Sequence, residues 1–163
     1  PTRRSSDLSC WSRGQAWGIY GFLLSYQHTG DKQMVELSRS LAHYFLNRLP
    51  EDDVCHWDLA LLGTDAVRDS SAAAIAACGL LELVKALPTL DANRAYYEEM
   101  ALRIALSLTD NYLAHDDDPT EGLLQHSVYH MGSGKGVDQC CSWGDYFYLE
   151  LLARLRQIWY PYW

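Results

Sequence analysis

The chain has 163 residues, of which 48% are hydrophobic and 21% charged, which is ordinary for one folded domain and unlike a disordered chain. Its formal net charge of -8 argues against nucleic acid as a partner, because phosphate binding needs a concentrated Lys/Arg surface. No segment approaches the roughly 20 consecutive apolar residues that span a bilayer. We therefore expect no membrane partner either.

The five cysteines form an odd set without a Cys-x-x-Cys pair, which predicts neither a disulfide framework nor a zinc site. We expect no metal and no cofactor. Residues 1–9 carry charges but no apolar stretch follows them, so they do not resemble a signal peptide. We interpret residues 1–9 as a non-native or disordered leader. The sequence leaves a cytoplasmic or a periplasmic location open.

The first predicted element is a helix over residues 14–27, where apolar and small residues cover every side. Such a pattern is typical of a helix that is buried all round. After a turn at Gly30, Asp31 can cap a second helix. That helix is amphipathic, and therefore an outer one, with apolar residues at helical spacing: Met34, Leu37, Leu41 and Phe45.

The same alternation then repeats. Asp69 or Ser70 can cap an alanine-rich, buried helix over residues 71–87, and Asp91 can cap a longer amphipathic one. A third inner helix begins near Trp143. The apolar face of the fourth helix consists of Tyr97, Met100, Ile104 and Leu108.

These five main helices alternate inner, outer, inner, outer, inner, which places the chain in the all-α class. A strand-like pattern at residues 123–129 is weak. Stacked helix pairs form an open solenoid or a closed toroid, in which loops at one end of the inner helices make a pocket. Five helices cannot close a double-layered ring. We therefore expect a partner half of the same fold.

The most informative segment is Cys-Trp-Ser-Arg-Gly-Gln-Ala-Trp-Gly-Ile-Tyr-Gly, at residues 10–21. Arg13 offers planar, bidentate donors that suit a carboxylate. The indole faces of Trp11 and Trp17 can lie against the C–H face of a sugar ring. The same spacing fits a core tryptophan cluster with an arginine that caps a neighbouring helix, so the pattern alone leaves both interpretations open.

A second segment contains a glycine-rich loop just before the last helix. Tyr129, His130, Ser133 and Lys135 offer donors to anionic or hydroxyl groups there. The loop lacks the Gly-x-x-x-x-Gly-Lys-Ser/Thr spacing of a phosphate-binding loop. A solvated loop is a better interpretation for Ser133 and Lys135 than for Tyr129.

Several aspartates could be drawn as acids or bases, but Asp at a helix start is most often a cap. We interpret Asp69 and Asp145 as caps. Asp58 stays open between a loop anchor and a pocket wall. The acidic run at residues 116–118 is most simply a solvated turn. A calcium site is a remote alternative, because no EF-hand spacing follows the run.

Three ordered segments resemble family 88 of the glycoside hydrolases, the unsaturated glucuronyl hydrolases. They are the segment at 10–21, Asp-Ser-Ser-Ala-Ala-Ala-Ile-Ala-Ala-Cys-Gly-Leu-Leu-Glu-Leu at 69–83, and Cys-Ser-Trp-Gly-Asp-Tyr-Phe-Tyr-Leu-Glu at 141–150. The resemblance implies an (α/α)6 toroid in a chain roughly twice as long as this one. It makes residues 10–163 the C-terminal half, and the missing N-terminal half a partner.

The resemblance also implies a reaction. Family members remove the unsaturated (C4=C5) uronic acid from the non-reducing end of lyase-generated oligosaccharides. An aspartic acid protonates the vinyl ether, water adds at C5, and the hemiketal collapses, unlike carboxylate attack at the anomeric carbon. Both family aspartates lie upstream of residue 10. We therefore name no catalytic residue and expect this chain to be inactive alone.

A substrate-binding wall does carry over from the family. Trp11, Arg13 and Trp17 match its Trp-x-Arg-Gly-x-x-x-Trp-like positions, and Tyr129 matches its Tyr-His loop. These four residues are thus implied to bind unsaturated uronate-terminated oligosaccharides.

Members that act on sulfated glycosaminoglycan fragments have Ser-x-x-Ser-x-Lys in this loop. Here His130 replaces the first serine, while Ser133 and Lys135 remain as substrate-binding candidates. This favours a sulfated substrate only weakly. The parent polysaccharide stays open among chondroitin, hyaluronan, heparin-like, gellan and xanthan chains.

Three alternatives to this function remain. Family 105, the unsaturated rhamnogalacturonyl hydrolases, shares the fold and chemistry but usually shows Gly-Asn where this chain has Gly14 and Gln15. An α/α-toroid sugar epimerase would need histidines for proton transfer, and His56, His126 and His130 are its candidates. The third alternative is a non-catalytic sugar-binding fragment.

Overall fold

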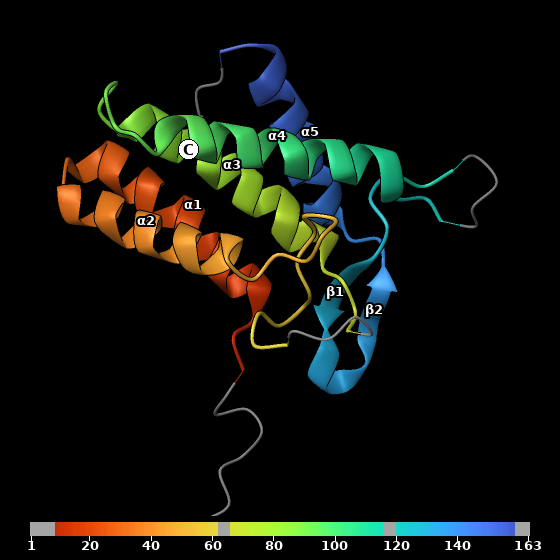
Figure 1. Cartoon of the computed structure of the whole chain (residues 1–163). Coiled ribbons are helices and arrows are strands. Elements are labelled where there is room, and N and C mark those ends of the chain that lie inside the picture. Colours follow the sequence, from red (N-terminus) through yellow and green to blue (C-terminus); the bar gives the residue numbers. More distant parts are fainter. Residues whose placement is uncertain (1–8, 62–65, 116–119, 159–163) are drawn as a thin grey trace, which may run out of the picture.

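The structure, a computed structural model, describes residues 9–61, 66–115 and 120–158. Its elements in chain order are α1 (Ser12–Thr29), α2 (Lys32–Leu46), α3 (Ser70–Ala86), α4 (Arg94–Asn111), β1 (Ser127–His130), the 3-10 turn η2 (Met131–Ser133), β2 (Lys135–Gln139) and α5 (Ser142–Arg156) (Figure 1). Strands β1 and β2 pair as an antiparallel hairpin. None of the described helices is long and apolar enough to cross a membrane. The predicted leader, apart from residue 9, and the acidic run at 116–118 lie outside the described residues.

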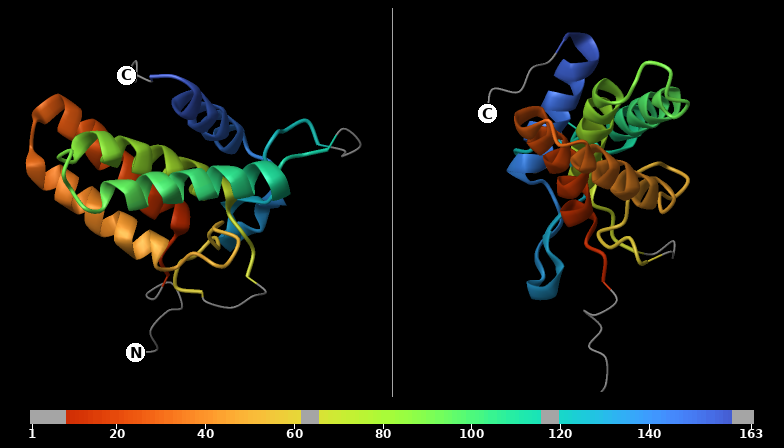
Figure 2. Two further views of the ribbon diagram at one scale, coloured as in Figure 1. Left: turned by 45° about the horizontal axis from the view of Figure 1, so that its top comes forward. Right: turned by 90° about the vertical axis from the view of Figure 1, so that its left-hand side faces the viewer.

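Helix α3 is the centre of the fold. It packs against both α1 and α5, while α2 packs on α1 and α4 packs on α3 (Figure 1; Figure 2). Every residue from Ser70 to Leu80 is buried. Small residues permit this close packing: a Cβ added at Gly79 would lie 2.8 Å from Cγ2 of Ile19. The predicted alternation of inner and outer helices is confirmed, and the chain is a partial α/α toroid.

The prediction that the first inner helix is buried all round is wrong. Trp17 is 40% exposed, and a Cβ added at Gly21 would meet no atom within 4 Å. Helix α5 likewise exposes Leu149 and Leu152. The reason is that α1 and α5, unlike α3, each have an inner neighbour on one flank only within the described part of the chain.

The outer helices follow their predicted faces in part. On α2, Phe45 is buried as predicted but Leu37 is exposed. Ser38, and not Leu37, is buried against α1, and the Ser38 hydroxyl donates to the carbonyl oxygen of Ile19 at 2.7 Å. On α4 the predicted apolar face is confirmed, since each member is buried: Tyr97, Met100, Ile104 and Leu108.

Two predicted helix caps are confirmed. Asp31 accepts a hydrogen bond from the backbone N–H of Gln33 at 2.9 Å at the start of α2. Asp69 accepts one from Ala72 at 3.3 Å at the start of α3. Both satisfy donors that the first helical turn leaves unpaired.

Two others are wrong. Helix α4 follows Asn93 and has no side-chain cap, while Asp91 forms an ion pair with Arg39 at 2.5 Å. Asp145 lies within the first turn of α5, and its Oδ1 accepts hydrogen bonds from the backbone N–H groups of residues 123–124 at 3.0 and 2.9 Å. Asp91 still binds locally, because its Oδ1 accepts the backbone N–H of Asn93 at 2.9 Å, but α4 begins two residues later than the sequence pattern predicts. For Asp145, donors from a distant segment bind the carboxylate that the pattern assigned to its own helix.

A buried ionic network joins the three inner helices. Arg154 of α5 donates to Glu150 at 2.8 Å, to Glu82 of α3, and to the hydroxyl oxygen of Tyr20 of α1 at 2.7 Å. Because a charge in a low-dielectric interior is very unfavourable unless it is paired, these contacts couple the positions of the three helices.

Candidate functional site

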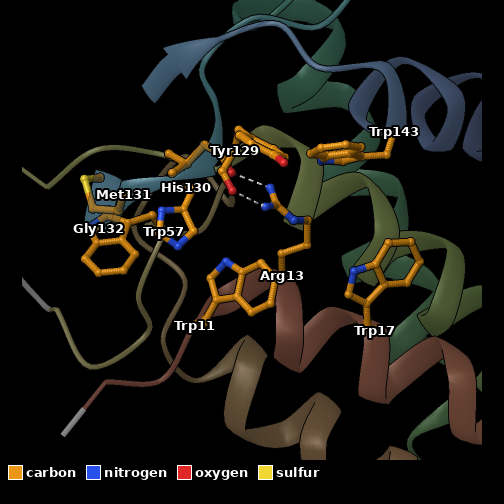
Figure 3. Close-up of a pocket in the computed structure, with 10 residues that line it drawn as sticks. Trp11, Arg13, Trp17, Trp57, Tyr129, His130, Met131, Gly132 and Trp143 are labelled. Atoms are coloured by element: carbon orange, nitrogen blue, oxygen red, sulfur yellow. Dashed lines mark hydrogen bonds between the residues drawn. The ribbon is translucent and has the colours of Figure 1, made fainter. Parts of the chain in front are cut away.

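A cavity of about 550 Å³ lies where the N-terminal ends of α1 and α5 meet the hairpin (Figure 3). Its walls are mainly aromatic, and its lining is Trp11, Arg13, Trp17, Trp57, Val128, Tyr129, His130, Met131, Gly132 and Trp143. Arg13 is the one side chain with a permanent charge among the described lining residues. Among these residues there is no carboxylate.

Arg13 is buried beneath the cavity wall, with 4% of its surface exposed. Its Nη2 donates to the carbonyl oxygen of Tyr129 at 2.8 Å, and its Nη1 donates to the carbonyl oxygen of Val128 and to Oγ of Ser71. Figure 3 shows the side chain pointing from α1 toward the hairpin. Arg13 therefore both holds the hairpin on the helices and places a positive charge behind the cavity.

The counter-ion of Arg13 is Asp69, whose Oδ2 lies 3.4 Å from Nη1. Burial raises the pKa of the Asp69 carboxyl, and a hydrogen bond from Ser71 together with the Arg13 charge offsets this effect only in part. Burial thus opposes the charge on Asp69. Arg13 lines the cavity and Asp69 does not, so the cavity wall carries a positive charge although the chain as a whole is acidic.

Indole faces enclose the guanidinium. Its Cζ lies 4.9 Å from the ring centroid of Trp11 and 5.1 Å from that of Trp143, within the range of cation–π attraction. The Tyr129 ring lies beside Trp143, with 5.4 Å between centroids. Trp17 completes the wall from α1 and packs edge-on against Phe147 at 5.0 Å. Flat, partly exposed rings of this kind suit the C–H faces of a sugar.

The loop before α3 brings Trp57 to the start of α1. The backbone N–H and the hydroxyl of Ser12 both donate to the carbonyl oxygen of Trp57 at 3.0 Å. Asp58, the next residue, accepts hydrogen bonds from the Ser9 hydroxyl and from the backbone N–H groups of Cys10 and Ala60. Asp58 does not line the cavity, so it is a loop anchor and not a pocket wall.

The hydrogen bonds to Asp58 also set its protonation. Burial acts to raise the pKa of the carboxyl, but the bonds from Ser9, Cys10 and Ala60 outweigh burial and hold the pKa below its ordinary value. Asp58 is therefore a stable carboxylate that joins the segment before α1 to the Trp57 loop.

The structure brings together four of the six predicted binding residues: Trp11, Arg13, Trp17 and Tyr129. Ser133 and Lys135 are exposed on the turn of the hairpin, outside the lining. The Ser133 hydroxyl lies 2.9 Å from Nδ1 of His130. The sequence did not predict that Trp57 and Trp143 line the cavity. The signal for Trp57 was its position beside Asp58 in a predicted loop, and the signal for Trp143 was its position beside Gly144 at a predicted helix start.

The three histidines proposed for an epimerase are not gathered in one place. His130 lines the cavity. His56 is buried with its Nδ1 3.0 Å from the carbonyl oxygen of Ala66, and His126 pairs with Asp138 at 2.7 Å. Within the described residues, no group of three or more His, Cys, Asp or Glu side chains could hold a metal ion.

No protein-family model matches the chain, but curated proteins do. It is 47% identical to an unsaturated chondroitin disaccharide hydrolase of Streptococcus pyogenes, over 97% of this chain and 40% of the relative. It is 41% identical to an unsaturated glucuronyl hydrolase of a Bacillus species, over 98% of this chain and 42% of the relative. The chain thus spans about two fifths of the length of these relatives.

Solved structures of unsaturated glucuronyl hydrolases also match the fold of this chain. A crystal structure of a mutant unsaturated glucuronyl hydrolase from Streptococcus agalactiae, complexed with dGlcA-GalNAc6S, superposes with a TM-score of 0.93 at 45% identity, over 100% of this chain and 44% of that one. The chain is thus more than 40% identical to these proteins along nearly its entire length, and it shares their tertiary structure. The chain belongs to the unsaturated glucuronyl hydrolase family.

Proposed function

We propose that this chain supplies the sugar-binding wall of an enzyme that removes C4=C5 unsaturated uronic acid from the non-reducing end of lyase-generated oligosaccharides. The observation that carries the proposal is the cavity itself: the lining residues that the structure describes include five Trp and Tyr rings, one permanent cation and no carboxylate. Aromatic faces bind sugar rings through their C–H groups. The Arg13 charge attracts the uronate despite the acidic chain.

The same composition argues that the wall binds but does not catalyse. Hydration of a vinyl ether needs a carboxylic acid placed to protonate it, and the aspartates near the cavity in the described part of the chain are committed elsewhere. Asp69 pairs with Arg13, Asp58 anchors the loop before α3, and Asp145 holds residues 123–124. The acid must come from a part of the protein outside these residues, which we place in an N-terminal half of the toroid.

The substrate class we propose is a disaccharide of unsaturated uronate and hexosamine. A relative is named for unsaturated chondroitin disaccharides, and another was crystallised with a sulfated disaccharide. Ser133 and Lys135 lie on the hairpin whose residues 128–132 line the cavity. We propose that they contact a sulfate at the cavity rim, where Lys135 would provide a flexible point charge.

The test is the loss of ultraviolet absorbance of the C4=C5 conjugated carboxylate, measured with unsaturated chondroitin and heparin-type disaccharides. We expect turnover by a full-length protein that includes an N-terminal half and none by the 163-residue chain. Tryptophan fluorescence titration should still detect disaccharide binding to the chain. Turnover by the chain alone would move catalysis to a carboxylate within it, and failure of both proteins to turn over would reject the function.

The sulfate contact has its own test. Lys135→Ala should weaken binding of a sulfated unsaturated disaccharide about threefold to tenfold, the range of a charge-assisted contact at an exposed site, and leave the unsulfated disaccharide unaffected. Lys32→Ala on α2, far from the hairpin, is the matched control (Figure 1). Equal losses for the two sugars would show that Lys135 does not bind the sulfate.

A further inference from the structure

Trp143 carries a donor that the fold leaves unused. Its indole Nε1 is buried and has no hydrogen-bond partner among the described residues, although Trp143 lines the cavity. Leaving a buried N–H unpaired is unfavourable, and native proteins seldom do so without a functional reason. Because Trp143, unlike the other residues with an unpaired buried polar atom, lines the cavity, a molecule bound there is a source of the missing acceptor.

The surroundings indicate which acceptor this is. The Trp143 ring centroid is 5.1 Å from the Arg13 guanidinium carbon, so an oxygen that meets the indole N–H also lies in the field of a cation. The Nη atoms of Arg13 already donate to backbone and side-chain oxygens of the chain. A negatively charged oxygen gains most here, because a hydrogen bond to an ionised acceptor is stronger than one to a neutral acceptor.

The Tyr129 ring packs beside the Trp143 ring in the cavity wall. The two ring centroids lie 5.4 Å apart, and Figure 3 shows the two side by side in the wall. Tyr129 is 52% exposed, so its ring has room to turn toward solvent. Exposed side chains change rotamer within nanoseconds, and such a turn would open the indole N–H to the cavity.

We propose that Trp143 is a specificity-determining residue, whose indole N–H donates to a carboxylate oxygen of the bound uronate once the Tyr129 ring turns aside. This inference rests on the proposed function, which supplies the uronate. Beyond the aromatic wall, it specifies that Nε1 of Trp143 is the donor and that a carboxylate oxygen of the uronate is the acceptor.

The indole N–H can be observed directly by NMR. The chain has six tryptophans, and each indole gives its own 1H–15N resonance. We expect the Trp143 resonance to move downfield when the 15N-labelled chain is saturated with unsaturated chondroitin disaccharide, and to move further than the other five. A Trp143 resonance that stays in place while others shift would overturn the proposal. Assignment from backbone spectra makes this test independent of any variant.

A variant gives the second measurement. Trp143→Phe keeps an aromatic ring and removes the N–H, and Trp17→Phe is the comparator whose contact is through its ring face. We expect Trp143→Phe to weaken binding of the disaccharide about tenfold and that of its carboxyl-reduced analogue less than about twofold. Trp17→Phe should affect both ligands equally.

The outcomes separate this inference from the function on which it rests. Equal losses for both ligands in Trp143→Phe, with binding by the native chain intact, would reject the carboxylate contact and leave the proposed function standing. Absence of binding by the native chain to either ligand would reject both. Unchanged thermal unfolding of the variant shows that a loss of binding comes from the missing donor.

Discussion

Arg13 and Tyr129 are 116 positions apart in the sequence, and a hydrogen bond of 2.8 Å joins Nη2 of the first to the carbonyl oxygen of the second. The guanidinium that gives the cavity its positive charge therefore also holds the strand that carries much of its wall. Because binding and local stability depend on the same side chain, a variant of Arg13 requires a measurement of ligand affinity and a measurement of the free energy of unfolding.

Arg13→Ala should lower the free energy of unfolding by about 3 kcal/mol, because it leaves Asp69 buried without its counter-ion. Arg103→Ala is the matched control, since its ion pair with Asp53 is exposed and should contribute less than about 1 kcal/mol. Urea unfolding of the two variants measures the difference. Similar values would mean that the Arg13 pair is no stronger than a surface pair.

Gly136 should set the position of Tyr129. Both Gly136 and Gly134 have positive φ, 54° and 67°, so alanine at either site introduces strain of about 1 kcal/mol. A Cβ at Gly136 would also lie 2.7 Å from the Cβ of Tyr129, whereas one at Gly134 meets nothing within 4 Å.

We therefore expect Gly136→Ala to weaken disaccharide binding by about threefold to tenfold, as for loss of one well-placed contact, and Gly134→Ala to leave it unchanged at similar stability. Fluorescence titration of the two variants checks this. Equal affinities would show that the position of Tyr129 does not matter for binding.

Asp58 should give the chain part of its acid sensitivity. Its pKa is lowered in the folded state, so its contribution to stability is complete above the unfolded value of about 3.9 and is lost as the pH falls through the folded pKa. Asp58→Asn does not titrate. The variant should be less stable than the native chain by about 1 kcal/mol at pH 7, and this difference should shrink below about pH 4.

Urea unfolding at several pH values between neutral and acid measures that difference. Asp110→Asn, at an exposed position of α4, is the control and should stay within about 0.5 kcal/mol of the native chain throughout. A stability difference for Asp58→Asn that does not change with pH would mean that hydrogen-bond geometry, not charge, is what the carboxylate contributes.

The exposed side of α5 should drive self-association. Large apolar side chains recur there at helical spacing and are exposed: Tyr146, Leu149, Leu152 and Leu155. Contiguous apolar surface of this kind favours association in water. We expect oligomers of the 163-residue chain in size-exclusion chromatography with light scattering, and a shift toward monomer in the Leu149→Ser, Leu152→Ser double variant.

Leu90→Ser is the control, because Leu90 is 97% exposed but isolated in the turn before α4 and should not alter association. A monodisperse native chain that unfolds cooperatively as a monomer would contradict the prediction. It would also weaken the expectation that this fold has a partner half.

Sequence alone was enough to predict the helices, their alternation and part of the cavity. Helical periodicity depends on residues three and four positions apart, which a linear pattern records. Asp69 could be predicted as a cap for the same reason, since its acceptor and the N–H of Ala72 lie within one turn. Trp11, Arg13 and Trp17 meet in the cavity because one helix start carries all three.

Only the tertiary structure decided which distant residues join them. Asp145 has the sequence position of a cap, yet it binds the N–H groups of residues 123–124, and a carboxylate at a helix start looks the same in either case. Trp143 meets Arg13 because α3 holds α1 and α5 at fixed positions. Such contacts depend on how helices pack, which is set by side chains from all of them at once and not by any local spacing.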